Sequence, residues 1–163
     1  MQSSKIRVLG IDPGSSCTGY GVLEEDQGEP RVVASGVIRA PKGALAMRLA
    51  KIYSGLDEVL GVHQPDAVAV EEVFHARNAK SALVLGHARG VALLVAGLAG
   101  IEVHEYPTRK VKQTVTGHGG ADKEQVRQVL GALLGEMPAQ LDASDALAVA
   151  LCHLRHANIT GLS

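Results

Sequence analysis

The pattern of apolar and polar residues in the first forty positions predicts β-strands. Apolar and β-branched side chains dominate residues 6–11, 18–23 and 31–39, and turn-forming residues separate these runs. Short connections of this kind join antiparallel strands, because parallel strands need a longer crossover. We therefore expect three consecutive antiparallel strands at the start of the chain.

Helical and strand-like patterns alternate through the rest of the sequence. Residues 44–63 repeat apolar side chains at helical spacing, and Pro65 prevents this helix from continuing. A short buried strand at 67–70, a long apolar helix at 78–98 and a strand at 101–106 follow. Three further helices are expected, at residues 107–115, from residue 122 and at residues 142–156. This order predicts an α/β fold with a five-stranded mixed sheet, three antiparallel strands and then parallel ones, flanked by helices.

Size and composition restrict the class of protein. The chain has 163 residues, of which 46% are hydrophobic and 20% charged, so we expect one globular domain over residues 1–163. Its two cysteines, Cys17 and Cys152, are too few for a disulfide framework. The uncharged run 90–101 is well short of the roughly 18 residues that indicate a membrane span. We therefore expect a cytoplasmic protein that does not enter a membrane.

The formal net charge of −1 hides an uneven distribution. Between residues 75 and 128 the basic side chains outnumber the acidic ones by eight to four. Four acids gather near one turn, and we interpret them as the solvated tip of a hairpin: Glu24, Glu25, Asp26 and Glu29. The middle of the chain is thus the cationic part, which fits an anionic partner.

Two predicted strands end in carboxylates. Asp12 follows the apolar residues 8–11, and Glu71 follows residues 67–70. In layered α/β proteins, sites gather at the carboxyl ends of central strands, so both acids are expected at one rim of the sheet. Each alone also has a simpler interpretation, because Asp-Pro-Gly is a common turn and Glu71 can mark a strand that emerges into water.

A second pair of acids, Asp142 and Asp145, begins the last helix. A spacing of three places both carboxylates on one helix face. Asp142 also fits the N-cap of that helix, with Asp145 a first-turn acid. Four gathered carboxylates would raise one another's pKa unless a cation lay among them, and oxygen ligands favour Mg²⁺ or Mn²⁺. Such a cluster suits two-metal phosphoryl transfer.

Seven motifs, in order and over almost the whole chain, resemble the RuvC family of bacterial Holliday-junction resolvases. They are Leu9-Gly10-Ile11-Asp12-Pro13-Gly14-Ser15 with Thr18-Gly19-Tyr20-Gly21, Val70-Glu71-Glu72-Val73-Phe74, Asn78-Ala79-x-Ser81-Ala82-Leu83, Gly86-x-Ala88-Arg89-Gly90, Val111-Lys112-Gln113-Thr114-Val115-Thr116-Gly117 and Asp142-x-x-Asp145-Ala146-Leu147-Ala148. The strand-turn around Asp12 occurs in other RNase H-like and actin-like proteins, whereas the full series is specific.

The resemblance implies an RNase H-like fold and a homodimer that nicks two strands of like polarity at a four-way DNA junction, in recombination and repair. It implies Asp12, Glu71, Asp142 and Asp145 as the metal-binding catalytic acids, with two Mg²⁺ ions that Mn²⁺ can replace. It also implies a branch-migration complex of the RuvA and RuvB type as partner.

The same resemblance implies residues that contact DNA. Phe74 matches an aromatic that contacts the junction, although this single Phe of the chain would also suit the aliphatic core. Lys112 and Lys123 match lysines near the scissile phosphate, with Lys112 in the catalytic set, and each also fits a solvated helix position. The further phosphate contacts expected are Arg77, Lys80, Arg109 and Lys110.

Three other functions remain open on sequence. An RNase H-like nuclease acting on RNA or another branched substrate shares the same acids. An actin-like ATP-binding protein needs a second glycine-rich phosphate loop in a strand-turn, whereas residues 117–120 follow a predicted helix. A catalytically silent junction-binding module would have no need for the complete acidic set.

Overall fold

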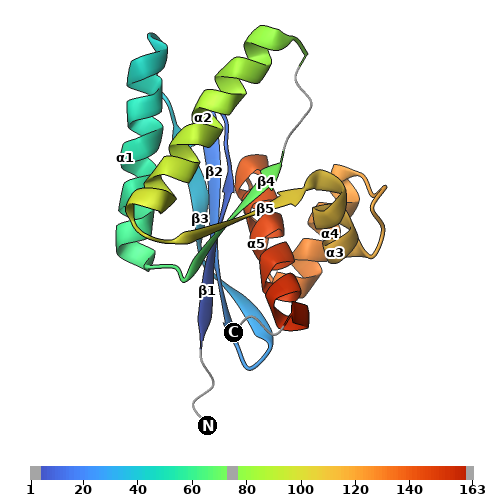
Figure 1. The fold of residues 1–163 in the computed structure, drawn as a ribbon. Coiled ribbons are helices and arrows are strands. Elements are labelled where there is room, and N and C mark those ends of the chain that lie inside the picture. The colour runs from blue at the N-terminus through green and yellow to red at the C-terminus, as the bar shows by residue number, and fades with distance from the viewer. Residues whose placement is uncertain (1–4, 73–76, 161–163) are drawn as a thin grey trace.

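The fold is a five-stranded mixed sheet with helices on both faces (Figure 1). The computed structural model describes residues 5–72 and 77–160. The strands lie in the order β3-β2-β1-β4-β5, with β1, β2 and β3 antiparallel and β4 and β5 continuing parallel to β1. Their bounds are β1 Ile6–Asp12, β2 Cys17–Asp26, β3 Glu29–Arg39, β4 Ala67–Glu72 and β5 Glu102–Pro107. This confirms the predicted fold class.

Five helices in the described part of the chain divide between the two faces of the sheet. They are α1 Leu45–His63, α2 Ala79–Leu98, α3 Thr108–Thr116, α4 Lys123–Leu134 and α5 Leu141–Thr160. Successive strand residues point to opposite faces, so Val8 packs in the core under α3, α4 and α5, while Leu9 packs in the core under α1 and α2. Figure 1 shows the two helical layers on either side of the sheet.

Local side-chain chemistry sets several helix ends. Asn78 accepts a hydrogen bond from the Ser81 N–H at 2.9 Å and so caps α2. Asp122 and Gln125 form a reciprocal capping box at the start of α4. Pro107 is the residue before α3, where its missing N–H costs no helical hydrogen bond.

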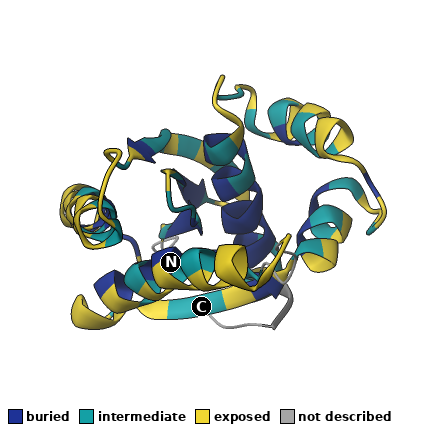
Figure 2. Cartoon of the chain, turned by 90° about the horizontal axis from the view of Figure 1, so that it is seen from above, coloured by how far each residue is buried: buried dark blue, intermediate teal, exposed yellow. Residues whose placement is uncertain are grey.

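Helix α5 lies unusually close to β1 and β2, because glycines face it. A Cβ at Gly10 would overlap the carbonyl oxygen of Ala146, and a Cβ at Gly19 would overlap that of Asp142. Most of α5 is buried in consequence, including Leu147 and Leu151 (Figure 2). The glycines therefore let the helix backbone rest directly on the strands.

The interpretation of the acids near residue 26 as a solvated tip is wrong for two of them. Only Gln27 and Gly28, both at positive φ, form the turn, whereas Glu24 and Glu25 lie buried in β2. The Glu24 carboxylate binds the guanidinium groups of Arg31 and Arg7, which lower its pKa to about 2. Strand pairing thus supplies the cations that allow this acid to be buried.

Helix α2 presents two unlike faces. Small residues such as Ala88 and Ala92 are buried in the core, while Leu83, Leu94 and Leu98 are exposed. Within the described part of the chain, α2 is the one helix long and apolar enough to cross a membrane by length and composition, a test that core helices of soluble proteins also pass. Its exposed leucines form a stripe that nothing within the described chain covers.

We predict that Gly10→Ala destabilises the fold by about 1–3 kcal/mol, the usual cost of overpacking a tight interior contact, because the new methyl group displaces α5. Denaturant unfolding measures this loss. Gly61→Ala, on α1 with open space around its Cβ, is the control and should raise stability by up to about 1 kcal/mol. Equal stability of Gly10→Ala and the unmodified protein would contradict the close packing described here.

Candidate metal centre

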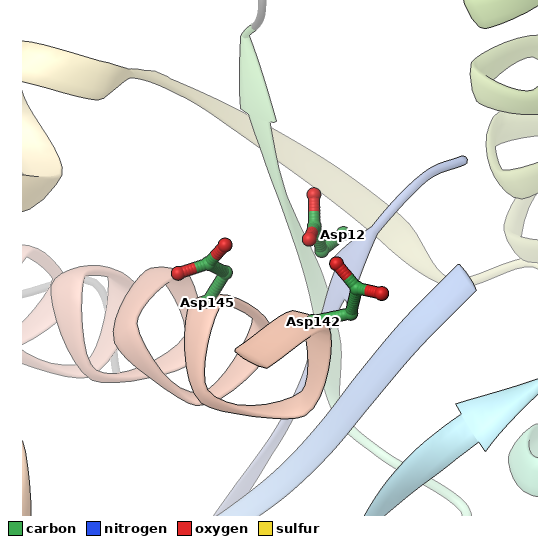
Figure 3. Close-up of side chains that lie close together, drawn as sticks. All are labelled: Asp12, Asp142 and Asp145. Atoms are coloured by element: carbon green, nitrogen blue, oxygen red, sulfur yellow. The ribbon is translucent and has the colours of Figure 1, made fainter. Parts of the chain in front are cut away.

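Three of the four predicted acids converge above the carboxyl end of β1. Asp12 is the last residue of β1, and Asp142 and Asp145 project toward it from the first turns of α5 (Figure 3). One carboxylate oxygen from each lies within 4.8 Å of the others. Because α5 begins at Leu141, Asp142 is its second residue and not its N-cap. The structure therefore favours the interpretation of Asp142 and Asp145 as part of an acidic cluster over their interpretation as helix-capping residues.

Glu71 reaches the same cleft from the neighbouring strand. Ile11 of β1 pairs with Val70 of β4, so Glu71 follows at the level of Asp12. It lines the cleft with the three aspartates but does not belong to their 4.8 Å cluster. The hydroxyl of Thr108, the first residue of α3, donates a hydrogen bond of 3.4 Å to the backbone carbonyl of Glu72 and partly offsets the burial that raises the pKa of Glu71. The four acids thus form a close group of three and one acid beside it.

The cleft has a volume of about 300 Å³ and is lined by both acidic and apolar side chains. Its apolar lining comes from Leu85, Val111 and Val126, and two lysines, Lys112 and Lys123, complete the wall. Lys123 Nζ lies 3.5 Å from the Asp145 carboxylate, so one cation already offsets part of the negative charge.

Burial and mutual repulsion raise the pKa of carboxyl groups in the cleft. Burial, together with the charges of Asp145, Asp142 and Glu71, raises the pKa of Asp12 to about 8. Burial also raises the pKa of Asp145 and of Glu71. The Asp145 carboxylate in turn raises the pKa of Lys123. The metal-free site therefore binds protons that a divalent cation would displace.

The donor set fits a hard divalent cation. All three clustered ligands are carboxylate oxygens, the type that Mg²⁺ and Mn²⁺ prefer. One oxygen from each aspartate lies within 4.8 Å of the other two, close enough for the three carboxylates to share one ion. Asp12, Asp142 and Asp145 can hold such an ion, and Glu71 is placed to bind at its edge or to hold a second ion.

The remaining predicted residues occupy different places. Lys112 and Lys123 line the cleft. Arg109 and Lys110 are exposed on α3, and Arg77 and Lys80 are exposed around the start of α2. Phe74 lies outside the described residues. The structure thus brings two of the predicted DNA contacts to the acids and leaves four at the surrounding surface.

Sequence reasoning missed three side chains that support the site. Thr108 binds the backbone at the end of β4 as described, and Arg48 of α1 donates two hydrogen bonds, of 3.1 and 2.9 Å, to the carbonyl of Ser15 in the turn after Asp12. Burial and a hydrogen bond to Asp142 raise the pKa of the Cys17 thiol. The sequence carries no local signal for these contacts, because each joins residues far apart in the chain.

Comparisons with known proteins agree with this geometry. The family model described as "Crossover junction endodeoxyribonuclease RuvC" matches residues 8–153. A protein of that name from Hahella chejuensis is 53% identical over 150 residues, which cover 91% of this chain and 87% of the relative. Another from Chromohalobacter salexigens is 50% identical over 153 residues, covering 93% and 82%. The solved structure of Thermus thermophilus RuvC in complex with Holliday junction substrate has a TM-score of 0.89 and 36% identity, covering 95% and 96%.

We predict that Asp12→Asn stabilises the metal-free protein while it removes the metal-dependent activity. The folded protein keeps a proton on Asp12 up to about pH 8, whereas the unfolded chain releases it near 3.8, so stability falls as pH rises between these values. Without metal near pH 8, the variant should melt several degrees higher, since about 1 kcal/mol shifts Tm by about 2–4 °C in a domain of this size.

Thermal melts in a chelator across this pH range provide the measurement. Asp57→Asn, at an exposed position of α1, is the matched control and should leave Tm and its pH dependence unchanged. A lower Tm for Asp12→Asn at high pH would show that the carboxylates do not repel one another in the folded chain.

Proposed function

This chain belongs to the RuvC family of crossover junction endodeoxyribonucleases, and we propose that it resolves four-way DNA junctions at the carboxylate cleft by cutting two strands of like polarity. Its function is that of a Holliday-junction resolvase, in recombination and repair. The observation that carries the assignment of the site is the convergence of Asp12, Asp142 and Asp145 on one point.

The reaction is hydrolysis of a phosphodiester by water. We assign Asp12, Glu71, Asp142 and Asp145 as the catalytic acids that hold two Mg²⁺ ions, which Mn²⁺ can replace. When bound, the two ions supply an activated water on one side of the phosphorus and stabilise the leaving oxygen on the other. The carboxylates contribute geometry, since β1, β4 and α5 fix them on the sheet and on a buried helix.

Two lysines suit the anionic substrate. Lys112 lines the cleft from α3, and we propose that it acts on the scissile phosphate by offsetting the charge that develops on its oxygens. Lys123 is paired with Asp145 at 3.5 Å and has 78% of its side chain exposed, so it can turn toward the DNA backbone when a cation takes over the carboxylate. The position of both lysines in the cleft supports these proposed roles.

The surface around the cleft provides further DNA contacts in this proposal. Arg109 and Lys110 project from α3, and Arg77 and Lys80 flank the beginning of α2. We propose that these four contact phosphates and that Phe74, which follows β4 closely in sequence, stacks on a junction base.

We also propose a homodimer built on α2. Leu83, Leu94 and Leu98 lie on one stripe, opposite the buried Ala88 and Ala92, and each leucine has more than half of its surface exposed. Glycines 86, 90 and 97 have open space around their Cβ positions, so a second helix could approach closely. A twofold pair of clefts matches two symmetrical cuts.

The remaining assignments rest on family membership. We propose that the chain acts as one nuclease domain over residues 1–163, in the cytoplasm, together with a branch-migration complex of the RuvA and RuvB type. In a protein that works on DNA, the apolar stripe of α2 is better used between two copies than in a lipid bilayer.

The proposed reaction predicts paired nicks in a labelled synthetic four-way junction and none in a linear duplex of the same sequence. Cleavage should require Mg²⁺ or Mn²⁺, and Asp12→Asn should lose it by more than about 100-fold while it still binds the junction, because a metal ligand matters at least as much as its supporting residues. Denaturing gels measure the nicks and mobility shifts in Ca²⁺ measure binding. Binding without cleavage by the unmodified protein, with several junction sequences and both metals, would leave only a junction-binding module.

The proposed dimer predicts that Leu98→Glu yields a monomer at micromolar concentration, because a carboxylate would be buried between the two helices. Sedimentation velocity measures the mass. Met47→Glu, at an equally exposed apolar position of α1 (66% against 67%), is the control and should remain dimeric. If the unmodified protein sediments as a monomer, the interface on α2 does not exist.

A further inference from the structure

The end of β4 lacks support on one side. Pairing with β1 stops at Val70, one residue before Glu71, although pairing with β5 continues to Glu72. The last β5 partner is Pro107, which has no N–H to donate. The strand residue that carries a proposed metal ligand therefore needs another contact to fix its backbone.

Arg89 of α2 makes that contact. Its guanidinium Nη1 donates a hydrogen bond of 2.7 Å to the backbone carbonyl of Glu71. The Nη2 group of the same guanidinium forms an ion pair with the carboxylate of Glu105 on β5. Glu105 pairs across the sheet with Val70, so the guanidinium joins the ends of both parallel strands to the helix above them.

The geometry points to a structural use of this charge and not to a phosphate contact. Arg89 does not line the acidic cleft, and only 23% of its side chain is exposed. Its charge is paired with Glu105, so it adds little field at the cleft. A planar guanidinium can serve two acceptors at fixed angles, which a lysine ammonium does less well.

We propose that Arg89 is a positioning residue for the metal centre, which holds the main chain of Glu71 and thereby keeps its carboxylate beside Asp12. This inference rests on the proposed role of Glu71 as a metal ligand. Glu105 is part of the same arrangement, because its carboxylate binds the other nitrogen of the Arg89 guanidinium and so holds it in place.

The consequence is a specific defect in metal binding. Supporting residues around metal ligands typically contribute about 10–100-fold in metal affinity or activity. Arg89→Met keeps the aliphatic stem and removes the donors, so Mn²⁺ should bind about 10-fold more weakly, and cleavage should need correspondingly more Mg²⁺. Junction affinity in Ca²⁺ and dimer mass should stay unchanged. Arg89→Lys and Glu105→Gln should give smaller shifts in the same direction.

The test measures Mn²⁺ binding by electron paramagnetic resonance in the absence of DNA, and cleavage against Mg²⁺ concentration. Glu102→Gln is the matched control for Glu105→Gln, because it removes an exposed acid from the same strand and should change neither curve. Glu71→Gln is the reference variant. Adding Arg89→Met to Glu71→Gln should weaken Mn²⁺ binding no further, since both changes act through one carboxylate.

The possible outcomes test the positioning role of Arg89 and the metal-binding role of Glu71 separately. Unchanged Mn²⁺ binding in a folded Arg89→Met overturns the positioning role, as does a loss of junction affinity with normal metal binding. If Arg89→Met fails to fold, Arg89→Lys and Glu105→Gln decide, and normal Mn²⁺ binding in both overturns the proposal. Unchanged Mn²⁺ binding in Glu71→Gln would instead remove Glu71 from the metal centre, which separates a failure of the proposed site from a failure of the role of Arg89.

Discussion

Close contact between α5 and the sheet positions the acidic cluster. The carbonyl oxygens of Ala146 and Asp142 occupy the space that side chains at Gly10 and Gly19 would fill. Moving the helix outward by the width of a methyl group would carry Asp142 and Asp145 away from Asp12 and open the 4.8 Å cluster. The same close packing, made possible by Gly10 and Gly19, therefore sets both the core and the spacing of the three clustered carboxylates.

The packing of the hydrophobic core stabilises this arrangement, whereas repulsion between the carboxylates destabilises it. Three carboxylates are held together by a hydrophobic core that includes Leu147 and Leu151, although their charges repel. Lys123 offsets part of that repulsion, and protonation of Asp12 offsets more. A site preassembled in this strained ionic state favours binding of a divalent cation, since the cation removes the repulsion that the fold maintains.

The sequence predicted the order of the elements and the position of Asp12 and Glu71 at strand ends, because these depend on local patterns. Alternating strands, Pro65 and the carboxylates that follow apolar runs are all visible within a few residues. The burial of Glu24 was not predictable from the same information, because its partner Arg7 lies on a neighbouring strand. The sequence also could not show that Glu71 lies beside the three clustered aspartates and not among them, because this depends on contacts between residues far apart in the chain.

The acids come from the first strand, the fourth strand and the last helix of the described fold. In a chain that is still being synthesised, Asp12 and Glu71 exist long before α5 does, and the glycine surface that receives α5 is left open. The cluster of Asp12, Asp142 and Asp145 can form only after α5 has emerged and docked. A nascent chain, or one truncated before α5, therefore carries Asp12 and Glu71 without the two aspartates that complete the cluster.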